Sequence, residues 1–417
     1  MKRKNQSGIT LVALVVTIVV LLILAGVSIN LVLGENGLIS NAKEARDKTK
    51  TAEATEKSQL DSASDFISEA VNNTELPQTN ETKPYMPGDG FIKVDGTNLA
   101  NGLTIQDSDG NQYVWVEVPM TTDVYPTSKL GITEFNDEAY TKIENDLHTY
   151  TATYRKNTNY KDEYYEDTNN SADWYTSNQY TEQKQKMLKS VYQNGGFWVA
   201  RYEAGLTEEN NRTSHTTPTI KPQSKENLIP YNYVTRTEAK KLAEMVTYTK
   251  ENITYTGSLM FGVQWDLMMK FLEIKQITTD TEIVSKLNSN STNIGNYYNS
   301  TFKIGRGKYA KRGALSTWYN YTENLDGIVN NSVKEAQNSF DNAILTTTGA
   351  VNQNCLMNIY DIAGNVREWT LEYSSESSTP CANRGGDFGD AKTFASNRGY
   401  SSTEPSRDYT GFRICLY

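Results

Sequence analysis

The chain has few of the side chains that bind metals or act as nucleophiles. Its 417 residues include two histidines, His148 and His215, and three cysteines, Cys355, Cys381 and Cys415. Zinc sites usually take four Cys and His ligands at short spacings, and these residues are not spaced in that way. Neither histidine lies near a nucleophile motif. The sequence therefore disfavours zinc sites and histidine-dependent hydrolase chemistry.

An excess of positive charge is also absent. The chain has 41 Lys and Arg against 50 Asp and Glu, a net charge of −9. An acidic chain has no overall field that attracts phosphate backbones, so we expect no nucleic-acid partner. Disorder is disfavoured as well, because the 27 Tyr, 11 Phe and six Trp are more aromatics than disordered chains carry. We expect a core built largely from aromatic side chains.

Aliphatic side chains are nearly missing from residues 149–186, where only Ala152 and Ala172 occur. This segment predicts either a surface insertion tethered by aromatics or a recognition surface, because Tyr offers rigid contact area and a hydroxyl. Its aromatic residues are Tyr150, Tyr154, Tyr160, Tyr164, Tyr165, Trp174, Tyr175 and Tyr180.

One long apolar run is present, at residues 9–33, directly after a basic stretch at residues 2–4. As a helix it would span a bilayer core of about 30 Å. The basic residues predict that the N-terminus is cytoplasmic and that the chain after residue 33 lies outside the cell. The sequence thus predicts a single-pass membrane segment with an extracellular C-terminal domain.

Residues 8–12, Gly-Ile-Thr-Leu-Val, open this apolar run. The arrangement resembles the class III leader of type IV prepilins. The resemblance implies a leader at 1–8, cleavage after Gly8 by a prepilin peptidase, and methylation of the new Ile9 amine. Most pilins carry Glu at the fifth mature position, whereas this chain has Ala13, which favours a minor or tip subunit. A simple membrane anchor is the alternative.

The resemblance also implies how the chain is divided. We expect a pilin-type spine helix at 9–71, because small and apolar residues fall on one face of its second half. Residues 72–103 carry turn signals and predict a linker and the start of an outer domain, which continues over 104–417. Within a filament, the helix at 9–33 would pack against other pilin subunits.

Local patterns predict several elements of the outer domain. Short strands at 104–105 and 113–118 flank a turn at 107–110. A helix is predicted over 235–247, with Thr235 as N-cap, and another over 261–274. Residues 276–350 are rich in Asn, Thr and Ser and predict a loop-dominated region.

A series of segments identifies a relative of the outer domain. The most specific is residues 358–370, Asn-Ile-Tyr-Asp-Ile-Ala-Gly-Asn-Val-Arg-Glu-Trp-Thr. The order of these segments along the chain resembles that in the formylglycine-generating enzyme (sulfatase-modifying factor) family. The resemblance implies an α+β, C-type-lectin-like domain rich in irregular loops over 104–417. The other segments are residues 196–203, 230–234, 260–266, 384–388 (Arg-Gly-Gly-Asp-Phe) and 411–413 (Gly-Phe-Arg).

The resemblance implies a structural calcium ion. Its ligands would be the side chains of Asp361 and Glu368 and the carbonyl groups of Gly364 and Val366. Oxygen donors around a turn suit Ca²⁺, which takes six to eight oxygen ligands. A hydrogen-bonded turn without a metal is the alternative.

The family's oxygenase chemistry needs two cysteines after the Arg-Gly-Gly block, and these positions hold Asp390 and Ala395. Neither side chain offers the thiolate that copper(I) prefers. We therefore expect no copper and no enzymatic activity. Cys381 and Cys415 flank the final loop region and are candidates for a disulfide outside the cell, with buried free thiols as the alternative.

The block between Arg384 and Gly411 mixes charged, hydroxyl and aromatic residues, a composition that suits a recognition surface. The first hypothesis is a non-catalytic cell-surface minor pilin, pseudopilin or tip adhesin whose outer domain binds an extracellular protein or glycan. The alternatives are a membrane-anchored variable receptor, diversified by a retroelement within 384–413, and a divergent enzyme of the family. The candidate ligand-binding residues are Asp387, Phe388, Asp390, Lys392, Phe394, Asn397, Arg398, Tyr400, Arg407, Asp408 and Tyr409.

Overall fold

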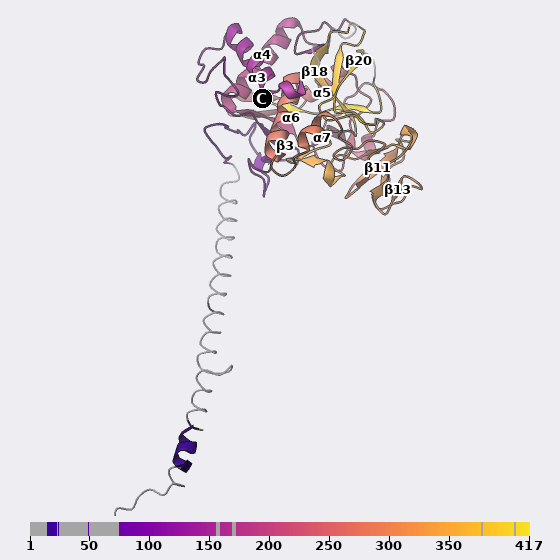
Figure 1. Cartoon of the computed structure of the whole chain (residues 1–417). Coiled ribbons are helices and arrows are strands. Elements are labelled where there is room, and N and C mark those ends of the chain that lie inside the picture. Colours follow the sequence, from indigo (N-terminus) through magenta and orange to yellow (C-terminus); the bar gives the residue numbers. More distant parts are fainter. Residues whose placement is uncertain are drawn as a thin grey trace, which may run out of the picture. The chain divides into compact units, whose positions relative to one another are not determined.

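The chain divides into two compact units, Met1–Asn72 and Asn73–Tyr417. Within the second unit, small sheets, short helices and long loops make up the described residues (Figure 1). The computed structural model describes residues 15–22, 24, 49, 75–155, 159–168, 172–376, 378–403 and 406–417.

The predicted long hydrophobic helix at 9–33 requires correction. In the part of the chain that the structure describes, no helix is long and apolar enough to cross a membrane. The predicted fold class, with its long pilin-type N-terminal helix, is therefore wrong for the described residues, and the pilin-like, transmembrane interpretation is dropped. Gly8, Ile9 and most of 9–71 lie outside the described residues.

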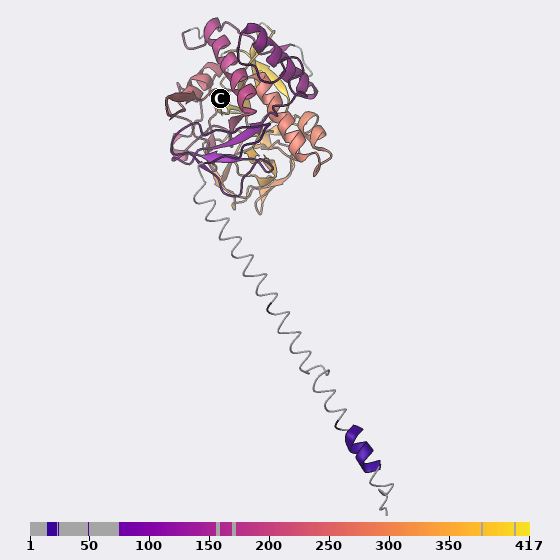
Figure 2. The ribbon, with the colours of Figure 1, turned by 90° about the vertical axis from the view of Figure 1, so that its left-hand side faces the viewer.

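One antiparallel sheet joins the two ends of the second unit. Strand β22 pairs with β5, which pairs with β3, and β3 pairs with β2, as the sequence predicts for the two strands flanking the turn. Figure 2 shows β2 and β3 in purple, side by side. In order across the sheet, the strands are β1 (Ile92–Lys93), β2 (Thr104–Gln106), β3 (Gln112–Glu117), β5 (Gly196–Ala200) and β22 (Cys415–Leu416).

The second large sheet contains motif segments of the C-terminal part of the chain. Its central strand β18 pairs antiparallel with β19 and β4 and parallel with β21. The parallel pairing brings the motif around Glu368 beside Gly411. The strands are β20 (Arg398–Ser401), β19 (Cys381–Arg384), β18 (Arg367–Ser374), β21 (Thr410–Phe412) and β4 (Tyr160–Lys161).

Side-chain caps set the starts of the helices. Thr176 and Gln179 form a reciprocal capping box, and so do Thr235 and Glu238, as the sequence predicts. Gly195 ends one helix with a φ of +65°, the left-handed conformation that glycine adopts without strain. The helices α3 and α4 lie side by side in Figure 1. Among the described residues of the second unit, the α-helices are α3 (Asp137–Tyr150), α4 (Ser177–Asn194), α5 (Arg236–Glu244), α6 (Gly262–Gln276) and α7 (Ile283–Asn288).

The region at 276–350 contains more regular structure than predicted. Two three-stranded sheets form there, and both are made of very short strands. The sheets are β10 (Phe302–Lys303), β14 (Val333–Lys334) and β13 (Val329–Asn330), and β12 (Tyr319–Asn320), β11 (Lys308–Lys311) and β15 (Ile344–Thr346).

Two-residue to four-residue strands and 3₁₀ turns complete the described fold. They are β6 (Gly205–Leu206), β7 (Ile229–Pro230), β8 (Thr247–Lys250), β9 (Ile253–Thr256), β16 (Cys355–Leu356), β17 (Ile359–Tyr360), η1 (Ala152–Tyr154), η2 (Glu208–Asn210), η3 (Phe340–Asn342) and η4 (Asn352–Asn354).

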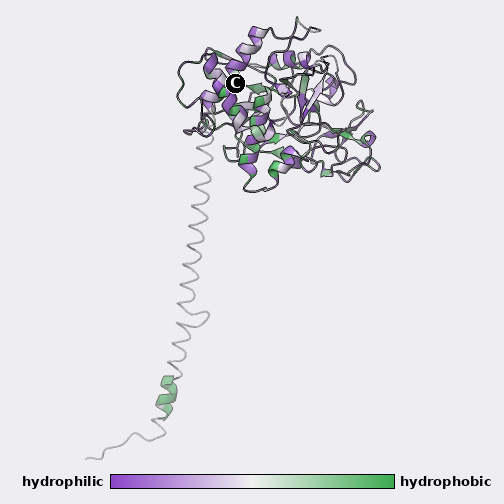
Figure 3. Ribbon diagram, turned by 45° about the horizontal axis from the view of Figure 1, so that its top comes forward, coloured by the Kyte–Doolittle hydropathy of each residue, from purple (hydrophilic) through white to green (hydrophobic). Residues whose placement is uncertain are grey.

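The core contains many aromatic side chains, but most of its buried hydrophobic residues are aliphatic, so the expectation of a largely aromatic core is wrong. The rings of Trp115 and Trp198 meet edge to face with centroids 5.0 Å apart. Most aromatic side chains of residues 149–186 are buried in this core, which fits a segment tethered by aromatics and contradicts the alternative of a recognition surface made of them. Figure 3 shows hydrophobic and hydrophilic residues alternating along the helices, which fits elements with one buried face. The buried aromatics of the segment are Tyr154, Tyr160, Trp174, Tyr175 and Tyr180.

Candidate functional site

A buried ion network holds Arg384 and Arg398, the first residue and a middle residue of the C-terminal block. Arg384, at the end of β19, donates from Nη2 to Oδ1 of Asp266 in α6 at 2.7 Å. Arg398, at the start of β20, donates from Nε to Oε1 of Glu372 at 2.9 Å and also pairs with Asp266. All four side chains are at most 6% exposed. Burial opposes ionisation of Glu372, but the two arginines outweigh it and hold its pKa below the ordinary value.

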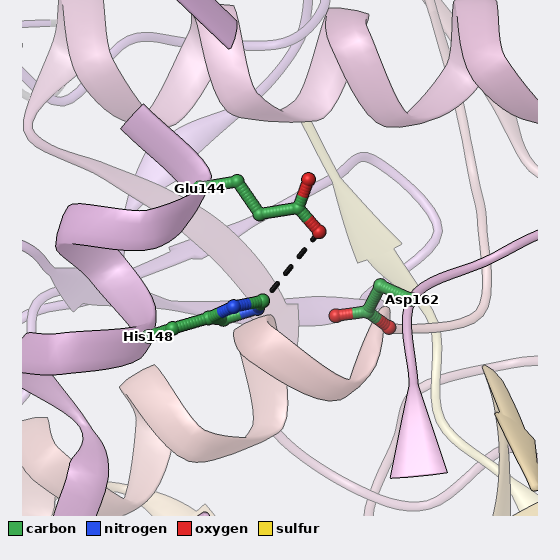
Figure 4. A group of neighbouring side chains, drawn as sticks. All are labelled: Glu144, His148 and Asp162. Atoms are coloured by element: carbon green, nitrogen blue, oxygen red, sulfur yellow. Dashed lines mark ion pairs between the residues drawn. The ribbon is translucent and has the colours of Figure 1, made fainter. Parts of the chain in front are cut away.

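Three further side chains, all of types that can bind a metal ion, lie beside this network (Figure 4). Among the described residues, only Glu144, His148 and Asp162 form a group of three such side chains whose ligand atoms all lie within 4.8 Å of one another. His148 Nε2 lies 3.8 Å from Glu144 Oε1. The Asp162 carboxylate accepts the backbone N–H groups of Gly262 and Val263, at 2.6 and 2.8 Å, and so caps α6.

The group needs no metal ion to balance its charge. Lys184 Nζ lies 3.0 Å from Glu144 Oε2 and donates to the Asp162 carbonyl at 2.9 Å. Burial, together with the charge of Arg155, lowers the pKa of His148 to about 4, so the imidazole is neutral at pH 7. The combined network then has equal numbers of opposite charges. Its carboxylates are Asp266, Glu372, Glu144 and Asp162, and its cations are Arg384, Arg398, Arg155 and Lys184. We interpret the group as structural.

The predicted calcium residues lie around a second buried network. The Glu368 carboxylate accepts from Arg413, with Nη2 2.6 Å from Oε1 and Nε 3.0 Å from Oε2. Asp361 Oδ2 accepts the Gly349 N–H at 2.8 Å, while Oδ1 is buried and has no hydrogen-bond partner among the described residues. Burial raises the pKa of Asp361 to about 6.

Gly364 and Val366 complete that turn. Gly364 has a φ of +72°, and a Cβ there would lie 2.1 Å from the carbonyl oxygen of Asn296, so only glycine fits. The Val366 N–H donates to Oε1 of Glu203 at 3.1 Å. Asn365 donates to the other oxygen of Glu203 at 2.6 Å.

Glu203 is the residue of this network that the sequence analysis missed. Its side chain is fully buried, and burial, with the negative charges of Asp361 and Glu368, raises its pKa well above the ordinary value. The three carboxylates outnumber the guanidinium of Arg413, so the charge would suit a cation. The geometry is less favourable, because Arg413 contacts both oxygens of Glu368. Calcium therefore stays a prediction. The only sequence signal for Glu203 was its place in the segment 196–203.

The structure divides the predicted ligand-binding residues into buried and outward positions. Phe388 is 1% exposed and packs in a small core, so it cannot contact a ligand. Asp387 and Asp390 both pair with Arg367, at 2.7 and 2.8 Å. Arg398 belongs to the buried ion network. The exposed members are Lys392, Tyr400 and Arg407, and the half-buried ones are Phe394, Asn397, Asp408 and Tyr409.

The two positions that would hold the family's catalytic cysteines have structural roles here. The Asp390 carboxylate binds Arg367, and the Ala395 carbonyl accepts the indole N–H of Trp265 at 3.0 Å. The disulfide considered between Cys381 and Cys415 is not formed. Both are buried free thiols, and they belong to different sheets.

Comparisons with known proteins identify no family. No family model and no curated protein matches the chain. A solved structure that resembles it is that of Treponema denticola variable protein 1, with 13% sequence identity and a TM-score of 0.27. The match covers 53% of this chain and 84% of that chain. At this score the likeness assigns neither a fold nor a function.

Proposed function

We propose that this chain is a non-catalytic surface protein whose second unit binds an extracellular protein or glycan. The recognition surface would be the outward side chains of residues 384–413. The observation that carries the proposal is the division of this block. Arg384 and Arg398 are held in a buried ion network, while Lys392, Tyr400 and Arg407 are exposed. Binding sites commonly consist of loop side chains on such a rigid scaffold.

The chemistry of the outward residues supports recognition rather than catalysis. Tyr400 is 60% exposed and offers a rigid ring with a hydroxyl, and the two cations add charge. In the resembled oxygenase family, copper chemistry needs thiols at the positions that hold Asp390 and Ala395. We therefore propose no enzymatic turnover.

Within this proposal we favour a variable receptor. A domain can accept changes at exposed positions at little cost in stability, whereas changes at buried ion pairs and core residues are costly. Variation in the block would then fall on outward residues such as Lys392 and Tyr400 and would spare Arg384, Phe388 and Arg398. Sequencing the coding region from many clones tests this, and differences spread evenly over the chain would contradict it.

The binding proposal is tested with cells that display the full chain. They are applied to an array of extracellular glycans and matrix proteins. A variant with Lys392, Tyr400 and Arg407 changed to alanine should lose binding. A control with Lys221, Lys303 and Phe340 changed to alanine removes two cations and one aromatic ring elsewhere and should keep it. Equal binding by both variants would show that the ligand is not recognised by these side chains of residues 384–413.

A further inference from the structure

A polar cavity of about 450 Å³ lies at one side of the first sheet, and residues 384–413 do not line it. Three of its lining side chains are cationic, Arg201, Lys225 and Arg306, and one is a carboxylate, Glu226. The lining therefore carries an excess of positive charge, although the whole chain has a net charge of −9. A cationic cavity in an acidic protein indicates an anionic ligand.

Arg201 is held at this cavity by two side-chain hydrogen bonds. Its Nη1 donates to Oε1 of Gln112 at 2.8 Å, and its Nη2 donates to Oδ1 of Asn358 at 3.2 Å. Its Nε is buried and has no hydrogen-bond partner among the described residues. Because both Nη atoms bind neighbouring side chains, the guanidinium has a fixed position in the cavity lining, where its charge can attract an anionic group.

Aromatic rings hold the two guanidinium groups in place. Tyr202 and Tyr360 stack with centroids 5.2 Å apart, and the guanidinium carbons of Arg201 and Arg306 each lie 5.6 Å from the Tyr360 ring. Arg306 also donates to the Tyr360 hydroxyl at 3.1 Å and to Glu226 at 2.7 Å. The cations are thus fixed before a ligand arrives, which lowers the entropy cost of binding.

A second cavity of about 270 Å³ adjoins the first at Asn227, which lines both. Besides the Lys308–Glu208 ion pair, this second lining offers amide and hydroxyl groups, from Asn320, Tyr321 and Thr347. Such groups both donate and accept hydrogen bonds, as the hydroxyls of a sugar require. The two cavities together therefore suit a ligand with an acidic group at one end and a hydroxylated body.

We propose that this pair of cavities binds an acidic saccharide, with the carboxylate of a hexuronic acid unit between Arg201 and Arg306. The neutral hydroxyls of the sugar would lie toward Asn227 and the second cavity. The site is separate from the recognition surface proposed above, so each can fail without the other.

Calorimetric titration of the full chain with D-glucuronate tests the proposal, and D-glucose is the uncharged comparison. We expect binding of glucuronate and none of glucose. The variants Arg306→Gln and Lys225→Gln each remove one lining cation and should weaken glucuronate binding about tenfold or more, the usual loss for a charge-assisted hydrogen bond. Lys303→Gln removes an exposed cation that does not line either cavity and should bind as the wild type does.

Thermal unfolding of each variant confirms that it is folded before its titration is compared. The proposal is overturned if glucuronate does not bind at millimolar concentration, or if glucose binds as tightly. It is also overturned if Lys303→Gln weakens binding as much as Arg306→Gln. If either Arg306→Gln or Lys225→Gln fails to fold, the other variant still tests whether the lining cations bind glucuronate.

Discussion

The guanidinium of Arg384 donates to the carboxylate of Asp266 at 2.7 Å, and neither side chain has any exposed surface. This contact joins the Arg-Gly-Gly turn after β19 to helix α6, over a separation of 118 residues. Arg398 contacts the same carboxylate from the next strand. These buried contacts therefore fix the backbone of the C-terminal block at Arg384 and Arg398, and they do not depend on its outward side chains.

Removing the shared carboxylate should be strongly destabilising. Asp266→Asn leaves two buried guanidinium groups short of one negative charge, and we expect a loss of about 3–5 kcal/mol in the free energy of unfolding. Asp280→Asn is the matched control, because Asp280 pairs with Lys286 at 2.7 Å and both are more than a fifth exposed. That change should cost about 1 kcal/mol or less. Urea unfolding of both variants measures the difference, and equal losses would contradict the anchoring role.

Two aromatic residues of the C-terminal block should respond in opposite ways. Phe388→Ala removes a side chain that is 1% exposed and should cost about 3–5 kcal/mol of stability. Tyr400→Ala changes a side chain that is 60% exposed and should leave the unfolding midpoint nearly unchanged while weakening ligand binding. Chemical denaturation and the array assay separate the two effects. Normal binding by Tyr400→Ala would remove that residue from the recognition surface.

The pH dependence of stability should contain two opposing contributions. Burial raises the pKa of Asp361 to about 6, so its stabilising contribution is complete below about pH 4 and is lost as pH rises through 6. Burial lowers the pKa of His148 to about 4, so its contribution is present above about pH 6.5 and is lost as pH falls through 4.

Two variants separate these contributions between pH 4 and pH 7. Asp361→Asn should lose stability more steeply on acidification than the wild type, because the contribution that grows at low pH is gone. His148→Gln should lose stability less steeply. Each difference should be about 1–3 kcal/mol across the range. Urea midpoints at several pH values provide the measurement, and parallel profiles for all three proteins would contradict both assignments.

Calcium is expected to stabilise the protein if the resemblance holds at this turn. The ion would be held by Asp361, Glu368 and the carbonyl groups of Gly364 and Val366, and it would offset the excess of buried carboxylates. We expect added Ca²⁺ to raise the unfolding temperature of the wild type and to have no effect on Asp361→Asn. An unfolding temperature that is the same in Ca²⁺ and in EDTA would mean that Arg413 alone balances Glu368.

The thiols should behave as three separate cysteines. Cys381 and Cys415 are buried and Cys355 is half-buried, and all three are free. Iodoacetamide should therefore label at most Cys355 in the native protein, and all three after unfolding without a reductant. Mass spectrometry counts the labels. A single label after non-reducing unfolding would reveal a disulfide and contradict the free thiols.

Local elements of this protein could be predicted from neighbouring residues. The turn at 107–110 and its two strands, and the capping box of Thr235 and Glu238, depend on contacts within a few residues. Side-chain burial could not be predicted in this way. Residues 149–186 have almost no aliphatic side chains, yet Tyr154 and Tyr180 are buried, because distant segments pack over them.

The sequence by itself determined the absence of thiols at positions 390 and 395 and the glycine at 364, since these follow from residue type. Only the tertiary structure decided which side chains of the C-terminal block face outward. It placed Arg398 against Asp266, across 132 residues of sequence, and brought Glu203 to Asn365. Pairing of buried charges depends on long-range packing, because a carboxylate stays ionised in the interior only where the fold brings a partner to it.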